Sequence, residues 1–425
     1  MQRLKIESDT LGAASKQSPA QHQDGHLRRV STGLRVGLLT GADDLPYALG
    51  LTLALAERGV HVEFIGSDRV CSAELLANPM VTFLNLRGDQ SENAASMHKA
   101  IRVLRYYLRL IKYAIVAKPR VFHILWNNKF ELFDRTALML LYRLMGRRVM
   151  LTAHNVNVAV RDGRDTGLNR LSLRVQYMLA SHIFVHTERM RGDLASDFGV
   201  PNRKTTVIPF GVYNNTPTTS MTDQEAKRRL AIPPGSRVLL AFGQIAPYKG
   251  LEILVAALPG LVQQDPSMHL VIAGKVKRGS EPYWRDIERQ LADPALLGHV
   301  TTHIEHIPDE NIEIYFKAAD LLVMPYTHIF QSGVLFLGYS FGLPVVATDV
   351  GSLKDDIVEG KTGMVCEPHN PADLARAIRQ YFDGAMYARL RSLRPEIQAH
   401  VNDGHAWSKV AGITESAYRS EPLDR

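Results

Sequence analysis

The chain has 425 residues, and its composition excludes several classes of protein. Hydrophobic residues make up 45% and charged residues 22%, which excludes a largely disordered, collagen-like or coiled-coil chain. No apolar run approaches the roughly 18 residues that span a bilayer, and residues 1–33 lack the apolar stretch of a signal peptide. Since only Cys71 and Cys366 are present, a disulfide framework is excluded and we expect a cytoplasmic protein.

The formal net charge of +7 is unevenly divided along the chain. Residues 1–212 contain 29 lysines and arginines against 18 aspartates and glutamates, whereas residues 213–425 contain 21 against 25. A basic first half indicates that one lobe faces an anionic partner. Nucleic acid, anionic lipid and a phosphorylated substrate all fit this charge at this stage.

The first half alternates short apolar runs with amphipathic stretches, after a polar segment at 1–33 that we expect to be a flexible tail. The runs predict strands at 34–41, 61–67, 81–86, 120–126, 147–155 and 182–187. The stretches between them predict helices at 46–59, 97–117, 132–146 and 168–180. This alternation predicts a parallel sheet covered by helices on both faces.

Residues 212–223 are rich in Asn, Thr and Ser and predict an interdomain linker, after which the same rhythm restarts. The later elements are strands at 237–243, 269–275, 299–306, 320–325 and 344–350, with a helix at 251–264. We therefore expect an α/β fold of two Rossmann-like doubly wound domains, 34–211 and 224–385, that face each other across a cleft. Residues 386–425 are expected to form a helical segment that packs back on the N-terminal domain.

The sequence FGQIAPYKG at 242–250 predicts a phosphate site. Gly243 follows a strand and permits a close approach of the backbone, and Lys249 lies at a predicted helix start. A lysine there adds a full charge to the partial positive charge of the helix N-terminus. An ordinary strand–turn–helix with a surface lysine fits the same residues equally well.

A second predicted anion site lies at Ser332 and Gly333, where a helix of apolar residues begins. Serine is a favoured N-cap, and Gly333 permits close approach to the next N–H groups. A capped core helix explains these residues as well. Two such sites about 80 residues apart favour a diphosphate ligand over either structural explanation.

These stretches resemble a known family. FGQIAPYKGLEILVAAL, HLVIAGK, AADLLVMPY, QSGVLFLGYSFGLPVVATDVGSLKDDI and EGKTGMV resemble the C-terminal domain of the family 4 glycosyltransferases. LTAHN (151–155), HTE (186–188) and VIPFGV (207–212) resemble the N-terminal half, so the likeness covers 34–385. It implies the GT-B fold, retention of anomeric configuration, a nucleotide-diphosphate sugar as substrate, and no cofactor or metal. The absence of any Asp-x-Asp triplet agrees with a metal-free site.

The resemblance also assigns roles to individual residues. Lys249 should contact the donor diphosphate, with Gly243 at the turn beneath it. The backbone amides that hold the phosphates fall at Ser332, Gly333 and Val334. His154 matches a histidine that faces the donor sugar, although a capping histidine in a loop is its purely structural explanation. Pro308 lies in the loop expected near the nucleobase.

Two departures from the family pattern concern the donor site. Gln244 stands where the family usually has an arginine, and Ile329 and Leu337 stand where it usually has two glutamates. The change resembles a variant branch that has QSGV in place of the glutamate loop. Lys275, at the end of the neighbouring strand, is expected to supply charge to the donor, with Lys277 and Arg278 close by. A solvated basic loop explains these three residues equally well.

Residues 98–120 predict an amphipathic helix that contains no acidic residue. Its apolar residues recur at three- and four-residue steps on one face: Ile101, Leu104, Leu108, Ile111 and Ile115. A basic stripe adjoins that face: Arg102, Arg105, Arg109 and Lys112. The pattern fits an interfacial helix near anionic lipid, and it also fits a core-packed helix with a solvated basic edge. Interleaved tyrosines would suit nucleic acid, but the motifs above argue against that partner.

The interpretation that unites these features is a metal-independent, retaining hexosyltransferase. It would move a hexose from a UDP- or GDP-sugar to a saccharide or polyprenyl-linked acceptor in polysaccharide or glycolipid assembly. We expect it in the cytoplasm, peripherally on the inner face of the membrane. Because of Gln244 and the missing glutamates, a catalytically silent homologue that binds nucleotide or glycan is the alternative. A nucleotide-sugar epimerase-hydrolase on a similar two-domain fold is a third interpretation.

Overall fold

The computed structural model describes residues 33–41, 45–91, 95–212 and 216–420. The predicted tail, apart from Gly33, and residues 213–215 of the predicted linker therefore lie outside the described residues. Among the residues described, no helix has both the length and the apolar character needed to cross a membrane.

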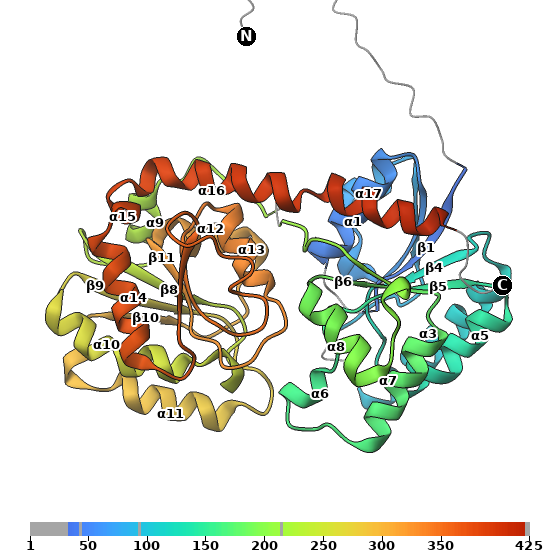
Figure 1. Ribbon diagram of the computed structural model, residues 1–425, viewed down its shortest axis with the longest axis horizontal. Helices are drawn as coiled ribbons and strands as arrows, with labels where there is room; N and C mark the ends of the chain where they lie inside the picture. The colour runs from blue at the N-terminus through green and yellow to red at the C-terminus, as the bar shows by residue number, and fades with distance from the viewer. Residues whose placement is uncertain (1–32, 42–44, 92–94, 213–215, 421–425) are drawn as a thin grey trace, which may run out of the picture.

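The first lobe is built on a seven-stranded parallel sheet with strand order β3-β2-β1-β4-β5-β6-β7 (Figure 1). Its strands are β1 (Arg35–Leu39), β2 (His61–Gly66), β3 (Val81–Asn85), β4 (Val121–Ile124), β5 (Arg148–Thr152), β6 (His182–Val185) and β7 (Thr205–Val207). Its helices are α1 (Leu45–Glu57), α2 (Ala73–Ala77), α3 (Ser96–Val116), α4 (Glu131–Phe133), α5 (Met139–Leu144), α6 (Val158–Arg161), α7 (Gly167–Leu179) and α8 (Glu188–Phe198). A π-helical turn at Asp134–Leu138 joins α4 to α5.

The second lobe has a six-stranded parallel sheet with strand order β10-β9-β8-β11-β12-β13. Its strands are β8 (Arg237–Phe242), β9 (Met268–Ala273), β10 (Val300–His303), β11 (Leu321–Met324), β12 (Val345–Thr348) and β13 (Gly363–Cys366). Its helices are α9 (Asp223–Arg229), α10 (Leu251–Gln264), α11 (Glu281–Leu291), α12 (Ile312–Ala318), α13 (Gly333–Ser340), α14 (Pro371–Asp383) and α15 (Ala385–Ala388). The expected fold class of two Rossmann-like domains is confirmed.

The chain returns to the first lobe through two helices, α16 (Leu390–His405) and α17 (Trp407–Arg419), which run along one side of the molecule (Figure 1). Helix α17 packs on α1. The Trp407 indole lies so close to Gly50 that a Cβ atom there would be 2.2 Å from it. Arg58, directly after α1, forms an ion pair of 2.6 Å with Glu415 of α17. The C-terminal helix is thus part of the first lobe's packing.

The two connections between the lobes run side by side. The backbone N–H of Val212 donates to the backbone oxygen of His405 at 3.2 Å, and Trp407 Nε1 donates to the Val212 oxygen at 2.9 Å. Away from this hinge, Lys277 Nζ pairs with Asp162 across the lobes at 3.1 Å. The cleft between the sheets is therefore bounded by polar contacts on both sides.

Helix α3 packs on the first lobe mainly through its tyrosines and not through its predicted apolar stripe. Three tyrosines, with Leu110 and Ala114, are buried against the first lobe: Tyr106, Tyr107 and Tyr113. Their rings supply apolar area while their hydroxyls bond to polar groups, as Tyr113 does to Glu63 at 2.8 Å. Four residues of the predicted apolar stripe are exposed: Ile101, Leu104, Leu108 and Ile115. Core packing is therefore wrong for these four and holds in part for Ile111, which is partly buried against the core.

Candidate active site

Strands β8 and β9 end side by side at the cleft, where two glycines bring their backbones together. The Gly243 N–H donates to the Ala273 oxygen at 2.9 Å, and a Cβ atom at Gly274 would lie 2.1 Å from the Gly243 oxygen. Gly243 has φ +101°, which favours glycine. A side chain there would meet Val334 at 3.3 Å and Lys249 Nζ at 3.8 Å. The turn therefore brings the first predicted phosphate motif against the second.

Lys249 is the last residue of a short 3-10 turn after β8, and its amine is buried. Its Nζ atom donates a hydrogen bond to the Tyr326 hydroxyl and lies 4.2 Å from the centre of that ring. No described carboxylate pairs with it. Burial, with a smaller contribution from the charge of Arg161, lowers its pKa to about 8. Lys249 is thus a cation held in place by a ring, with no anion beside it among the described residues.

Helix α13 begins at Gly333, the third residue of the QSGV sequence at 331–334. Ser332 occupies the N-cap position, as predicted, and is buried, but its hydroxyl accepts no cap hydrogen bond from the described residues. Ser332 instead faces the Tyr326 hydroxyl that bonds to Lys249. The first N–H groups of a helix lack intrahelical partners and carry partial positive charge. The helix start and Lys249 are therefore two positive features joined through Tyr326.

A cavity of about 380 Å³ brings half of the eight predicted donor residues together. Its wall contains Lys249, Ser332, Gly333, Val334, Asp309 and Gln331, and helix α1 of the first lobe contributes Leu45, Pro46 and Leu49. Ile329 and Leu337, the positions where the family usually has glutamates, also line this cavity. The Gln331 Oε1 atom is buried and has no hydrogen-bond partner among the described residues.

The other four predicted donor residues lie outside that wall, and one of them, Gly243, forms the turn beside Lys249 and Val334. Gln244 and Lys275 are exposed, and Pro308 directly precedes the cavity residue Asp309. Lys277 is bound to Asp162, so the interpretation of this lysine as part of a solvated loop is wrong. In the basic loop after β9, the exposed Lys275 can therefore contact an anion, whereas Lys277 already pairs with Asp162.

His154 follows β5 and lies in an aromatic surround. Its ring stacks on Trp126 at 4.4 Å between centres and meets Tyr47 edge-on at 4.7 Å. Its Nδ1 atom is 3.0 Å from Nε2 of His186, and its own Nε2 is buried without a partner among the described residues. Burial holds the pKa of His154 well below its ordinary value, and the neighbouring His186 and His123 lower it further.

His154 borders a separate cavity of about 200 Å³ in the first lobe, not the cavity of Lys249. That wall also contains Trp126, Asn127, Arg135 and Gln176. The side chain of Gln176 is buried and donates to Asn127 Oδ1 at 2.8 Å. The first lobe therefore offers a small polar cavity with an aromatic wall, while the second lobe offers the cationic one.

Sequence analysis missed Tyr326, His186 and Trp126 as partners of the candidate residues. Each follows the carboxyl end of a strand, β11, β6 or β4, which is the edge where ligands bind in doubly wound sheets. Their position at the carboxyl ends of predicted strands was the signal in the sequence that could have identified them. Among the described residues no group of three or more His, Cys, Asp or Glu side chains is arranged to hold a metal ion.

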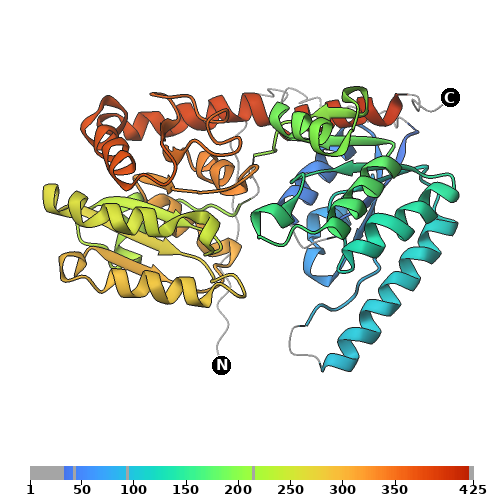
Figure 2. The same ribbon diagram turned by 60° about the horizontal axis from the view of Figure 1, so that its bottom comes forward.

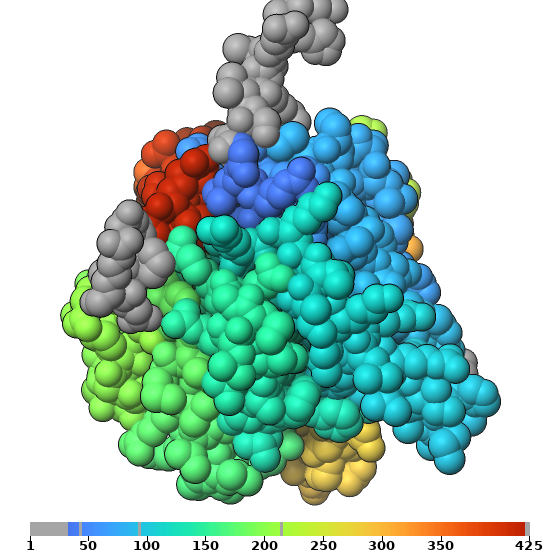
Figure 3. All heavy atoms as spheres, turned by 90° about the vertical axis from the view of Figure 1, so that its right-hand side faces the viewer, coloured from blue at the N-terminus to red at the C-terminus, as the bar shows by residue number. Residues whose placement is uncertain are grey.

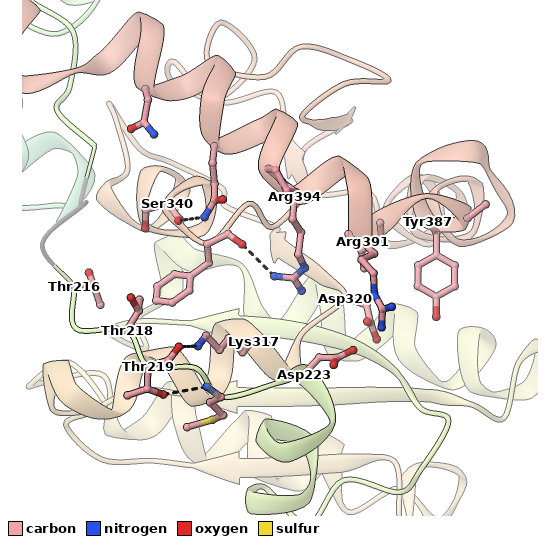
Figure 4. Close-up of a pocket in the computed structure, with 17 residues that line it drawn as sticks. Thr216, Thr218, Thr219, Asp223, Lys317, Asp320, Ser340, Tyr387, Arg391 and Arg394 are labelled. Atoms are coloured by element: carbon pink, nitrogen blue, oxygen red, sulfur yellow. Dashed lines mark hydrogen bonds between the residues drawn. The ribbon is translucent and has the colours of Figure 1, made fainter. Parts of the chain in front are cut away.

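A larger cavity, about 970 Å³, lies elsewhere, between the start of the second lobe and α16 (Figure 4). Two of its charged side chains, Lys317 and Arg394, bind backbone oxygens of neighbouring segments. Lys317 donates to the Thr219 oxygen at 2.6 Å, and Arg394 donates to the Phe341 oxygen at 3.1 Å. We therefore place the candidate site in the two smaller cavities at the cleft.

Two family models match the sequence of the chain. The one described as Glycosyltransferase Family 4 matches residues 46–214, and the one described as Glycosyl transferases group 1 matches residues 222–393. Between them they extend over both lobes. The chain belongs to the family 4 glycosyltransferases.

Curated relatives of this glycosyltransferase-family chain include two proteins with the same name. The D-inositol 3-phosphate glycosyltransferase of Pseudarthrobacter chlorophenolicus is 30% identical over 243 residues, which are 57% of this chain and 56% of that protein. The one from Geodermatophilus obscurus is 23% identical over 387 residues, covering 88% of this chain and 83% of that protein. The chain thus spans about half the length of the first of these relatives.

Two solved structures share the fold of both lobes. Sucrose-phosphate synthase from Thermosynechococcus elongatus superposes with a TM-score of 0.71 at 19% identity, over 91% of this chain and 98% of that chain. Anabaena HepE in complex with UDP-glucose superposes with a TM-score of 0.68 at 15% identity, over 91% and 100%. Both agree with the GT-B arrangement of two Rossmann-like lobes.

Proposed function

We propose that the protein transfers a hexose from a UDP- or GDP-sugar to a saccharide or a lipid-linked saccharide. The observation that carries the proposal is the cavity in which Lys249 and the start of α13 converge. Its chemistry suits a diphosphate, which needs fixed positive charge and N–H donors. The names of the curated relatives and the UDP-glucose bound to Anabaena HepE support a nucleotide-sugar donor.

The proposed mechanism stabilises the departing nucleoside diphosphate. As the glycosidic bond to the diphosphate breaks, negative charge grows on the leaving oxygen. Lys249 Nζ and the N–H groups of Gly333 and Val334 are fixed in advance and offset that charge without a metal ion. Retention follows if the acceptor hydroxyl attacks from the face of the leaving group and gives its proton to the departing phosphate. No enzyme nucleophile is required.

The ribose hydroxyl groups of the donor need hydrogen-bond acceptors in the protein. The glutamates that usually stand at positions 329 and 337 are absent from this chain. Gln331 and Asp309 line the same cavity, and the Gln331 Oε1 atom has an unused lone pair among the described residues. We propose that these two side chains accept hydrogen bonds from the donor in place of a glutamate at Leu337. The exposed Lys275 is proposed to add long-range charge at the rim.

In this proposal the first lobe holds the acceptor and the transferring sugar. His154 Nε2 is a buried acceptor without a described partner, which suits a sugar hydroxyl. Asn127 and Gln176 add amide groups to the same cavity. Closure of the lobes about Val212 and His405 would bring this wall to the donor.

A catalytically silent, nucleotide-binding homologue is the second candidate function. The specific observation in its favour is that Ile329 and Leu337, at the two usual glutamate positions, make part of the cavity wall apolar. Such a protein would bind a nucleoside diphosphate through Lys249 but would neither transfer nor hydrolyse the sugar of a nucleotide sugar.

A donor screen separates these functions. The purified chain is incubated without acceptor with UDP-, GDP- and ADP-sugars, and thermal stability and released nucleoside diphosphate are both measured. Ligand binding to the folded state raises the melting temperature. A transferase shows a shift and slow donor hydrolysis with a UDP- or GDP-sugar, whereas a silent homologue shows the shift alone. The proposal fails if no donor of either class produces a shift or hydrolysis.

A further inference from the structure

The outward face of α3 exposes five apolar side chains, while Ile111 on the same face is partly buried against the core. Figure 2 shows α3 as the long cyan helix at the outer edge of the first lobe, away from the second lobe. The exposed fractions are Met97 69%, Ile101 39%, Leu104 61%, Leu108 58% and Ile115 58%. Soluble proteins scatter such residues singly, so a stripe of five on one helix face indicates a contact surface.

An apolar groove of about 720 Å³ adjoins this stripe, between α3 and the start of α4. Leu104 and Leu108 line one side, and Phe130 and Phe133 line the other, with exposed fractions of 53% and 39% for the two phenylalanines. The ring of Tyr107 fixes the groove floor, because it stacks on Phe130 at 5.7 Å and meets Phe133 edge-on at 5.4 Å. The side chains of Phe130 and Phe133 are thus held in place by Tyr107 and exposed to solvent.

A row of cations follows the other side of the stripe. Its members lie on α3: Arg102, Arg105, Arg109 and Lys112. None forms an ion pair with another described residue, and α3 itself contains no acidic residue. Arg105 and Lys112 make no described hydrogen bond, whereas Arg109 donates to the Leu86 oxygen at 3.2 Å. Apolar side chains therefore lie between a basic row and a groove whose rim carries Lys99 and Lys129.

We propose that this face of α3, with its groove, binds the surface of an anionic lipid bilayer. The stripe and the two phenylalanines would enter the boundary between headgroups and acyl chains, while the basic row contacts the lipid phosphates. Figure 3 shows that the light blue and cyan atoms of this region project at the edge of the first lobe, so a flat surface can reach them.

A second copy of the chain fits this face poorly. In a twofold contact the same patch meets itself, so the cations of one α3 would oppose those of the other. Like charges brought together in this way cost free energy, and α3 supplies no carboxylate to offset them. An anionic bilayer satisfies both the apolar and the cationic side chains. This binding does not depend on the proposed transfer reaction.

Co-sedimentation of the full chain with vesicles tests the proposal. We expect binding to phosphatidylcholine–phosphatidylglycerol vesicles at low salt, little binding to phosphatidylcholine alone, and weaker binding at high salt. Changing Arg102, Arg105, Arg109 and Lys112 together to Gln should lower the binding constant by about tenfold or more. Changing Leu104 and Leu108 to Asn should remove the part of the binding that resists salt.

A matched control changes four exposed arginines of the second lobe, Arg228, Arg229, Arg285 and Arg289, to Gln. It removes the same charge and should bind vesicles like the wild type. Circular dichroism of each variant checks that the fold is kept. The proposal is overturned if the wild type does not bind anionic vesicles, or if the α3 variants and the control lose binding equally. A dimer in solution that Leu104→Asn with Leu108→Asn dissociates would also overturn it.

Discussion

The Nε2 atom of His186 lies 3.0 Å from the Nδ1 atom of His154, and the other ring nitrogen of His186 lies 3.3 Å from the backbone oxygen of Ile208. Because a carbonyl oxygen can only accept, Nδ1 of His186 carries the proton and its Nε2 accepts from His154. His154 is thereby fixed in the tautomer whose Nε2 atom has a free lone pair. The pair of histidines therefore leaves an acceptor, not a donor, at the buried Nε2 atom of His154, a residue that borders the first-lobe cavity.

The same pair predicts a loss of stability in acid. Burial lowers the pKa of His186 to about 4, whereas an unfolded histidine titrates near 6.5. Between those pH values the unfolded chain binds a proton that the folded chain does not, so the free energy of unfolding falls as the pH is lowered. The full contribution is present above pH 6.5, and the loss reaches about 3 kcal/mol near pH 4.

Denaturant unfolding at several pH values measures this effect. The variant His186→Gln should show a shallower fall in stability between pH 6.5 and 4 than the wild type does. His306→Gln changes an exposed histidine and serves as the control, with an unchanged slope. An identical slope in wild type and His186→Gln would show that His186 is not held neutral.

Packing of the C-terminal helix on α1 predicts a specific destabilisation. In Gly50→Ala the new Cβ atom would lie 2.2 Å from the Trp407 indole, which is itself tied to Val212 by a hydrogen bond. Overpacking of this kind typically costs about 1–3 kcal/mol, so the melting temperature should drop. Gly260→Ala in α10 has open space around it and should be neutral or stabilising. Equal melting temperatures for both variants would show that α17 is not tightly packed on α1.

The proposed charge stabilisation predicts activity without a divalent metal. Lys249 and backbone N–H groups supply the positive charge, so transfer should survive dialysis against EDTA. Activity is measured before treatment, after treatment, and after addition of Mg²⁺ or Mn²⁺. A loss that either ion restores would mean that the diphosphate is held differently.

The sequence allowed the architecture and much of the donor cavity to be predicted. Apolar runs located the strands because parallel strands are buried on both faces. Helix α10 was predicted with the bounds that it has, Leu251–Gln264. The convergence of Lys249 and Val334 followed from one rule, that the carboxyl ends of parallel strands meet at one edge of the sheet. Strand β13 was not predicted, since four residues at a sheet edge give little periodic signal.

Contacts between distant segments could not be predicted. The hydrogen bond from Lys249 to Tyr326 and the pairing of Lys277 with Asp162 join residues that only the folded lobes bring together. Helix α3 shows the same limit, because its periodicity defines an apolar face but not which face meets the sheet. In α3 the face with the tyrosines packs on the first lobe. Tyr107 and Tyr113 bury large rings there, and their hydroxyls donate hydrogen bonds to Asp134 and Glu63.

Binding of nucleoside diphosphate to the purified chain tests whether Lys249 holds the donor diphosphate. Calorimetry with UDP and GDP is compared for the wild type, Lys249→Ala and the control Lys361→Ala, which changes an exposed lysine of the same lobe. We expect the wild type and the control to bind one nucleotide alike. Lys249→Ala should bind it more weakly and transfer sugar about two to three orders of magnitude more slowly. Undiminished binding and turnover in Lys249→Ala would contradict the account.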